Sequence, residues 1–473
     1  MINTTNDFAN DSGINVIGEE QGKKRGGFTG KLGFVLAAAG SAVGLGNLWR
    51  FPYLAAQYGG GIFVLCYVLL AVLFGFSLLM LEIAIGRNTG KSVIGAFSKL
   101  NKKFKWFGYI CVIVPIMIVP YYCVIGGWVI KYIWAFITGD SSLLSATDST
   151  ATGEFFAGFV TSTWEPLLFF LIFATITVVI ISFGVQKGIE NMSKVMMPVL
   201  AVLAVFLMVY VLCQPGALEG AGYFLLPDFS KFSFKTVLGA LGQLFYSMSL
   251  AMCIMITYGS YMKKKVKITS SSAQIAIFDS GFAIVAGLIV IPAIFAFSAD
   301  PSASLAKPGS SLMFEQLTLV FNDIPGGRII GIIFFILVFF AALTSSISLV
   351  EAIVAVLCED GRMRRIIACC IVFGAILVLG TLSSLGNGVL SGVQIAGKGF
   401  LDMFDFIANN ILMPIIAIIT CVICGYFIDK KIMPKEIGID KKPWLNAYFN
   451  IVIRYIAPIC ILAILISGLF ITI

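Results

Sequence analysis

Asn47 and Arg50 place an amide and a positive charge inside an apolar run, directly after the glycine-rich segment 40–46. Lipid offers no hydrogen-bond partners, so polar side chains and broken helix at membrane depth occur only where they are buried in protein or line a cavity. Each glycine also costs a helix about 1 kcal/mol relative to alanine. Two glycines four residues apart favour close helix packing, but packing requires no arginine in the bilayer. The combination favours a functional break in a membrane helix.

A second apolar run, near 237–261, is interrupted in a similar way. It holds Gln243 and a stretch of small and polar residues around Ser247 and Ser249. The second interrupted run is the sixth in the chain, five runs after the first. Paired interruptions at matching positions in two halves of a chain indicate the binding site of a transporter.

Further carboxyl and hydroxyl groups lie inside apolar runs. Glu82 and Asp279 would be costly in lipid unless each meets donors, a cation or a proton. Asp402 and Asp405 lie near the outer end of the run at 400–428 and are natural partners for Arg50. One helical face of the run at 329–357 carries a polar stripe, which is typical of a wetted path. The stripe consists of Ala341, Thr344, Ser345, Ser348 and Glu351.

The composition is that of a polytopic helical membrane protein, because 59% of the 473 residues are hydrophobic and 12% are charged. The absence of histidine excludes a histidine proton relay, a histidine-ligated metal and a Ser-His-Asp triad. Gly90-Lys91-Ser92 lacks the first glycine and the preceding strand of a phosphate-binding loop. We therefore expect neither an enzyme nor an organic cofactor. The net charge of +8 arises in short loops between spans, so nucleic acid is not an expected partner.

Apolar runs long enough to cross a bilayer number about eleven. They lie near 32–58, 62–86, 107–137, 165–184, 195–213, 237–261, 273–298, 329–357, 366–385, 400–428 and 449–472. Lysine and arginine concentrate in alternate loops, as at 263–267, while the other loops are acidic. The positive-inside rule then places the N-terminus in the cytoplasm, and an odd number of spans places the C-terminus outside. Gly188 and Pro198 in the fifth run indicate either an ordinary kink or a cytoplasmic end that unwinds.

The string GSAVGLGNLWRFPY at 40–53 resembles the first-helix signature of the neurotransmitter:sodium symporter family, in its bacterial amino-acid branch. Agreement continues through the chain from about residue 25, in the order of the family. It includes Tyr121-Tyr122, the glycine and proline of the fifth run, Gln243 to Ser249, Leu343 to Ser346, and Leu401-Asp402 through Asp405.

The resemblance implies an all-α polytopic membrane protein with the LeuT-type 5+5 inverted repeat. Helices 1 and 6 would be broken, and about eleven transmembrane helices would be present. The implied division is a cytoplasmic segment at 1–27, helices 1–5 at 28–213, helices 6–10 at 214–428, and a loop with helix 11 at 429–473.

The resemblance also implies two sodium sites made of oxygen atoms alone, which suits a hard cation. The ligands of the first would be Ala42, Asn47, Ser247 and Asp279. The ligands of the second would be Gly40, Val43, Ala341, Thr344 and Ser345. The first sodium ion would also contact the substrate.

An amino-acid substrate would present its carboxylate to the first sodium, to the amides of Leu45 and Gly46 and to the Tyr122 hydroxyl. The dipole of the half-helix supports an anion there. The residues implied to contact the substrate are Ala42, Val43, Leu45, Gly46, Ile118, Tyr122, Tyr246, Ser247, Ser249, Met252, Ser345 and Leu349.

Two gates follow from the same resemblance. Outside, Arg50 would pair with Asp405, and Tyr246 would act as an aromatic lid. Inside, the paired residues would be Arg25 and either Glu359 or Asp360, close to Tyr261 and Glu351.

Some positions depart from the family pattern. Chloride-dependent relatives place serine one helical turn after the position of Asp279, where this chain has Ala283. Since alanine cannot help to bind an anion and Asp279 supplies negative charge, we expect transport without chloride, with Asp279 open to take a proton on the return step. Ala251 and Cys253 replace glycines that are usual near the helix-6 break, while Met252 adds a flexible side chain. These opposing effects leave the size of the substrate open.

The sequence thus predicts a sodium-coupled symporter that imports neutral, hydrophobic L-amino acids, aliphatic or aromatic, by alternating access. It would lie in a bacterial-type inner (plasma) membrane, with the bilayer and a small-molecule substrate as its partners and no obligatory protein partner. A non-transporting amino-acid sensor and a carrier of small amino acids stay open as alternatives. Gates on both faces favour transport over sensing.

Overall fold

The computed structural model describes residues 26–298, 300–305 and 309–470, and within these ranges the chain forms helices and no strand. Nine continuous helical segments of the described chain are long and apolar enough to cross a bilayer. They are α3–α4 (Gly61–Thr89), η3–α6 (Lys102–Thr138), α9 (Trp164–Ser182), η4–α10 (Val185–Leu212), α14 (Ile268–Phe297), α17 (Gly327–Leu357), α18 (Arg365–Leu385), α19–η9 (Phe400–Phe427) and α22–α23 (Pro443–Leu469).

Two further apolar runs are broken, where the sequence predicts breaks. Helix α1 (Lys31–Ala42) and the helical segment η1–α2 (Gly46–Gln57) meet at an angle of 52°. Helix α12 (Phe234–Ser247) and helix α13 (Ile254–Tyr261) are separated by residues 248–253. The nine continuous spans and these two broken helices match the predicted apolar runs one for one. The fifth span is helical through Gly188, in a π-helical turn, η4 (Val185–Glu190).

The break between α12 and α13 has a clear backbone cause. Ser249, Ala251 and Cys253 have φ angles of 53°, 60° and 66°. L-residues pay about 1–2 kcal/mol each for this left-handed region, and a right-handed helix cannot pass through it. Glu82 stabilises the broken segment, because its Oε1 accepts a hydrogen bond of 2.7 Å from the Ala251 amide. The buried carboxylate noted in the sequence therefore holds the break open.

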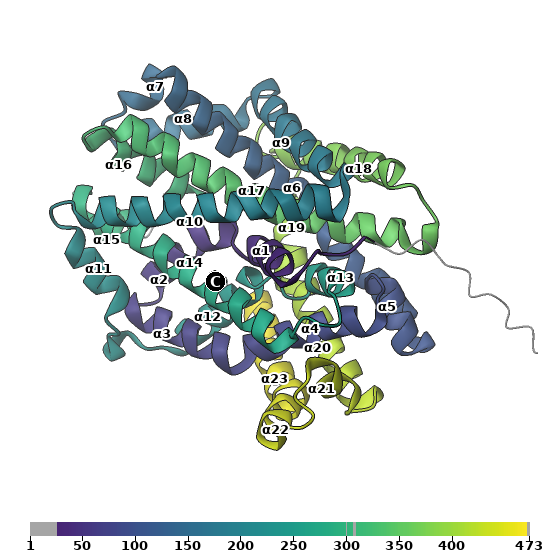
Figure 1. The fold of residues 1–473 in the computed structure, drawn as a ribbon. Coiled ribbons are helices and arrows are strands. Elements are labelled where there is room, and N and C mark those ends of the chain that lie inside the picture. Colours follow the sequence, from purple (N-terminus) through teal and green to yellow (C-terminus); the bar gives the residue numbers. More distant parts are fainter. Residues whose placement is uncertain (1–25, 299, 306–308, 471–473) are drawn as a thin grey trace, which may run out of the picture.

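Short helices in the loops cover the ends of the spans. They are α5 (Val93–Leu100), α7 (Ser141–Leu144), α8 (Ser149–Thr161), α11 (Ala217–Leu225), α15 (Pro301–Leu305), α16 (Leu317–Asp323) and α21 (Ile432–Ile437). Helix α1 lies at the centre of the molecule, in contact with α10, α14 and α17 (Figure 1). Helix α17 packs along α6, and α13 packs along α4. The two broken helices are thus enclosed by continuous ones.

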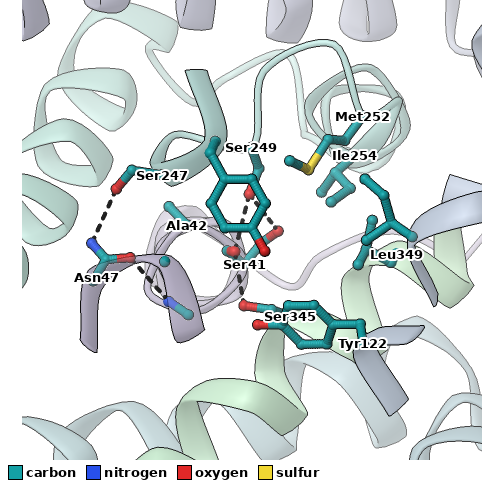
Figure 2. A pocket seen from close by; sticks show the side chains of 14 residues that line it. Ser41, Ala42, Asn47, Tyr122, Ser247, Ser249, Met252, Ile254, Ser345 and Leu349 are labelled. Atoms are coloured by element: carbon teal, nitrogen blue, oxygen red, sulfur yellow. Dashed lines mark hydrogen bonds between the residues drawn. The ribbon is translucent and has the colours of Figure 1, made fainter. Parts of the chain in front are cut away.

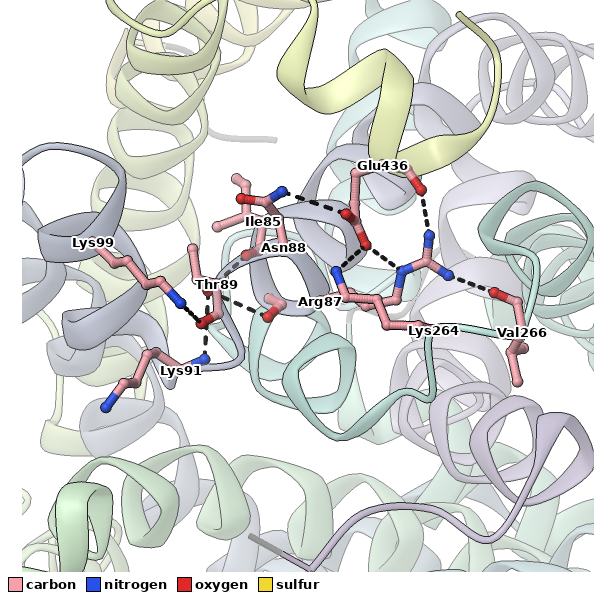
Figure 3. Close-up of polar contacts among 10 residues, drawn as sticks. Ile85, Arg87, Asn88, Thr89, Lys91, Lys99, Lys264, Val266 and Glu436 are labelled. Carbon is pink, nitrogen blue, oxygen red and sulfur yellow. Dashed lines mark hydrogen bonds and ion pairs between the residues drawn. The ribbon is translucent and has the colours of Figure 1, made fainter. Parts of the chain in front are cut away.

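A charged cluster fastens α21 to the end of α4 and to the loop after α13 (Figure 3). Arg87 Nε lies 2.6 Å from Glu436 Oε1, and Lys264 Nζ lies 2.8 Å from the same oxygen. The other guanidinium nitrogens of Arg87 donate to the backbone carbonyls of Val266 and Glu436. The cluster therefore ties together three segments that lie far apart in the sequence.

Stability should depend on the charge of Glu436. Partial burial raises the pKa of this carboxyl, but hydrogen bonds and charges from Lys264 and Arg87 outweigh burial and hold the pKa below its usual value. Because the pKa of Glu436 is lowered in the folded protein, its charge stabilises the fold above the ordinary glutamate pKa of about 4.3. This stabilisation is lost as the pH falls through the lowered pKa. We expect Glu436→Gln to melt about 2–4 °C lower at pH 7.

Melting of the two proteins between pH 7 and pH 3 measures this difference. The melting temperatures should converge at the acid end of the series. Glu165→Gln, which removes the partner of Lys131 in another ion pair, serves as the control. A constant gap between wild type and Glu436→Gln down to pH 3 would contradict the assignment.

Candidate binding site at the breaks in helices 1 and 6

The two helix breaks and the middle of α6 and α17 surround a cavity of about 20 Å³ (Figure 2). A cavity needs about 10–15 Å³ to hold one water molecule, so a larger molecule requires the side chains around it to move. The lining residues are Ser41, Ala42, Gly44, Gly46, Asn47, Ile118, Tyr122, Tyr246, Ser247, Ser249, Met252, Ile254, Ser345 and Leu349.

Most of the residues expected to contact a substrate lie on this cavity. Val43 and Leu45 do not line it, but their backbones lie beside it: the Val43 carbonyl faces Ser345 Oγ at 3.3 Å, and the Leu45 amide donates to the Tyr122 hydroxyl at 3.2 Å. Ile254 lines the cavity although the sequence analysis did not include it. Its position depends on the path of the chain through residues 248–253, which apolar spacing does not reveal.

Asn47, Ser247 and Asp279 come together on one side of the cavity. Asn47 Nδ2 donates to Ser247 Oγ at 3.1 Å and to Asp279 Oδ1 at 2.8 Å, and Ser247 Oγ donates to Asp279 Oδ1 at 2.6 Å. Tyr67, which the sequence did not single out, donates to Asp279 Oδ2 at 3.0 Å. These side chains are at most 1% exposed. The Asp279 carboxylate and the Ser247 hydroxyl place oxygen atoms that suit a hard cation close together, while the Asn47 side-chain oxygen accepts the Gly44 amide at 3.2 Å.

A second group of oxygen atoms lies between α1 and α17. Ser345 Oγ lies 3.5 Å from the Gly40 carbonyl and 3.3 Å from the Val43 carbonyl. Thr344 Oγ1 donates to the Ala341 carbonyl at 3.1 Å. A Cβ atom at Gly40 would stand 3.3 Å from Thr344 Cβ, so glycine allows this close approach. The five residues expected at a second sodium site are therefore neighbours.

Polar groups also line the cavity itself. Ser249 Oγ donates to the Ser41 carbonyl at 3.0 Å, close to the broken end of α1. The Tyr246 ring lies against Gly46, where an added Cβ would stand 2.5 Å from the ring. The cavity thus combines backbone and hydroxyl groups on the side of the helix breaks with the apolar side chains of Ile118, Met252, Ile254 and Leu349.

Comparison with known proteins agrees with this architecture. The family model described as the sodium:neurotransmitter symporter family matches residues 25–156 and 161–472. The chain belongs to this family. An uncharacterized sodium-dependent transporter of Bacillus subtilis (strain 168), YhdH, is 36% identical over 92% of this chain and 96% of its own length. The sodium-dependent serotonin transporter of Drosophila melanogaster is 26% identical over 93% of this chain and 75% of its own length.

A solved structure gives the same fold. The crystal structure of MhsT in complex with L-phenylalanine has a TM-score of 0.84 and is 36% identical, covering 94% of this chain and all of that one. The protein is therefore a sodium-dependent symporter with a LeuT-type fold, and a multi-pass membrane protein.

On the outer side of the cavity, this symporter does not form the expected ion pair between Arg50 and Asp405 in the described structure. The Arg50 guanidinium carbon lies 5.3 Å from the centre of the Tyr246 ring, and Asp405 instead accepts a hydrogen bond of 2.6 Å from Asn409. A second cavity, of about 50 Å³, begins beyond Tyr246 and is lined by Arg50 and Asn409. Tyr246 thus covers the central cavity as the predicted lid does, and the role of Arg50 and Asp405 as a gate stays a prediction.

The inner side is held by a buried carboxylate. Glu351, fully buried, accepts a hydrogen bond of 2.7 Å from the Tyr261 hydroxyl and forms an ion pair with Arg365. Arg365 Nε also donates to the Ile181 carbonyl at 2.8 Å. Arg365 is one of three arginines close together, at 362, 364 and 365, and nothing in the spacing distinguishes it from the other two.

Glu359 and Asp360, which were also expected at the inner gate, have hydrogen-bond or ion-pair partners as well. Glu359 accepts hydrogen bonds from the amide and hydroxyl of Ser92, and Asp360 pairs with Lys91. Arg25, their expected partner, lies outside the described residues. Phe28 is 1% exposed and packs edge-on against Tyr258 and Tyr261. Buried side chains therefore close the cavity toward this face.

Proposed function

We propose that this symporter imports neutral, hydrophobic L-amino acids by alternating access, coupled to two sodium ions and independent of chloride. The observation that carries the proposal is the composition of the central cavity. Broken helices supply backbone groups for an amino group and a carboxylate, while Ile118, Met252 and Leu349 offer an apolar surface for a side chain. The complex of MhsT with L-phenylalanine supports the same substrate class.

The two sodium ions would occupy the two groups of oxygen atoms described above. The ion beside Asn47, Ser247 and Asp279 would also meet the substrate carboxylate, which couples the two binding events. Asp279 supplies a negative charge next to this ion, and Ala283 offers no hydroxyl to an anion. These features support transport without chloride. The two repeats at 28–213 and 214–428 would move around the shared site.

The orientation follows from charge alone. Basic loops at 263–267 and 430–442 would face the cytoplasm, which places the C-terminus on the outer side of a bacterial-type inner membrane. Sodium that enters at a negative membrane potential contributes about 2.3 kcal/mol per charge for each 100 mV. Two ions could therefore drive strong accumulation of substrate.

Uptake into proteoliposomes with an inward sodium gradient tests the proposal. Labelled leucine, phenylalanine, tryptophan, alanine and glycine are compared, with potassium in place of sodium as the control. Sodium-dependent accumulation of the large side chains is expected. Accumulation of only alanine and glycine, which the small cavity would favour, would identify a carrier of small amino acids. Sodium-dependent binding without accumulation would identify a sensor.

The Tyr122 hydroxyl should be needed for substrate affinity. It accepts a hydrogen bond from the Leu45 amide at the broken end of helix 1, next to the expected position of the carboxylate. A hydrogen bond to a charged group contributes about 1.5–3 kcal/mol, so Tyr122→Phe is expected to raise the KM for uptake at least tenfold. Tyr121→Phe is the matched control, since Tyr121 does not line the cavity. An equal rise of the KM in both variants would contradict this role.

A further inference from the structure

Arg454 is a positive charge inside the last membrane span, in the π-helical turn η10 (Val452–Ile456). Its guanidinium carbon lies 5.7 Å from the centre of the Tyr426 ring. Among the described residues no carboxylate forms an ion pair with it, and its Nε is buried without a hydrogen-bond acceptor. A charged side chain within a membrane span normally has a partner. The Nε atom of Arg454 is therefore a hydrogen-bond donor that no acceptor among the described residues uses.

The guanidinium lines a small pocket between the end of η9 (Ile423–Phe427) and the start of the last span. Lys430 lines the same pocket and supplies a second cation. Gly425 allows Arg454 to lie along η9, because a Cβ atom there would stand 3.1 Å from Arg454 Cγ. The one carboxylate on the pocket wall, Asp429, accepts the amide of Lys431 at 3.0 Å within its own turn. Within the described residues no ion pair joins it to Arg454 or Lys430, so the pocket wall carries two cations and one carboxylate.

The surroundings of the pocket are those of a membrane surface. Tyr426, Phe427, Ile451 and Tyr455 are each 50–63% exposed and lie in the two flanking spans. The connection between these spans carries five lysines, at 430, 431, 435, 441 and 442. Apolar side chains next to a basic loop match the acyl chains and the headgroup of a lipid, and a guanidinium binds phosphate through paired hydrogen bonds.

We propose that Arg454 and Lys430 bind the phosphate of an anionic phospholipid in the cytoplasmic leaflet. The assignment to this leaflet rests on the orientation proposed above, whereas the pocket itself does not depend on it. The negative lipids of that leaflet attract basic residues at about 1 kcal/mol per cation. The lipid would hold the end of η9 against the last span, close to α21 and its contact with α4.

Native mass spectrometry of the purified protein tests this site without any transport assay. Phosphatidylglycerol is added at a series of concentrations, with phosphatidylcholine and inorganic phosphate in parallel. We expect the wild-type protein to retain phosphatidylglycerol. The affinity of the protein for this lipid should fall about fivefold in Lys430→Gln and at least fivefold in Arg454→Leu. Arg454→Lys should retain part of the affinity. Lys442→Gln, which changes a lysine of the same connection outside the pocket, is the matched control.

Four results would overturn the proposal. Equal adducts in Arg454→Leu and wild type would show that the guanidinium does not bind the lipid. Equal retention of phosphatidylcholine would show that the negative headgroup is not recognised, and displacement of the lipid by millimolar phosphate would show a site for a free anion. A loss of dimers in Arg454→Leu with unchanged lipid adducts would assign the missing anion to a second copy of the chain. Each variant should melt at the same temperature as the wild type in each lipid, which verifies that the variant is folded.

Discussion

Asp279→Ala is expected to lower sodium-dependent uptake at least 100-fold. Asp279 is fully buried and accepts hydrogen bonds from Asn47, Ser247 and Tyr67. Alanine leaves these donors without their acceptor, and hydrogen bonds to a charged group contribute about 1.5–3 kcal/mol each. It also removes a negatively charged oxygen from the proposed first sodium site. Uptake and equilibrium binding of a labelled amino acid, as functions of sodium concentration, measure the loss.

Asp279→Asn separates the charge of this residue from its oxygen atom. The amide keeps one oxygen for a cation but leaves the sodium charge uncompensated, and Ala283 offers no hydroxyl to an anion, so we expect reduced uptake that chloride does not restore. Wild-type uptake should be equal in chloride and in gluconate. Glu219→Gln removes an exposed acid outside the cluster and should leave both properties unchanged. Strong stimulation of wild-type uptake by chloride would show that Asp279 does not replace the anion.

Arg365→Leu is expected to open the inner side of the protein and to lower its melting temperature by several degrees. The change leaves Glu351 buried without its cation, and removal of one partner of a buried ion pair costs about 3–5 kcal/mol. The cost falls on the closed state, because an opened inner side would return Glu351 to water. Hydrogen exchange of the amides around Phe28 and Tyr261 measures the opening, and uptake measured in parallel should fall.

The matched control is Arg364→Leu, which removes an exposed arginine next to Arg365. The double change Arg365→Leu with Glu351→Gln should recover much of the stability, since it removes both charges. Protection of the inner amides that stays at the wild-type level in Arg365→Leu would mean that Tyr261 and Phe28 close this face without the ion pair.

The helix breaks could be predicted because they leave a local signal. Glycines clustered with polar side chains inside an apolar run conflict with a continuous lipid-facing helix, and the two runs where the sequence predicts breaks on this ground, at 32–58 and 237–261, are both broken. The eleven spans follow from the same contrast between apolar and polar residues. Most cavity residues were then reached through the resemblance to the family, whose motif positions lie at these breaks.

Partners that depend on the path of the chain could not be predicted. Arg365 satisfies the positive-inside rule, so its position in the sequence was already explained, and only the fold brings it to Glu351. Tyr67 is one aromatic residue among many in its run, and its contact with Asp279 joins residues that lie 212 positions apart. Arg50 and Asp405 were matched by charge. In this structure Arg50 instead lies over the Tyr246 ring, and Asp405 accepts a hydrogen bond from Asn409.

The left-handed residues between α12 and α13 have a consequence for the speed of substrate capture. A right-handed turn through Ser249, Ala251 and Cys253 would require three backbones to change conformation together, and the Glu82 carboxylate would have to release the Ala251 amide. The Ser249 hydroxyl and the backbone groups of this segment are therefore assembled beside the cavity before any substrate arrives. A labelled amino acid should bind at a rate set by access to the cavity, with no slower phase for helix unwinding in rapid-mixing kinetics.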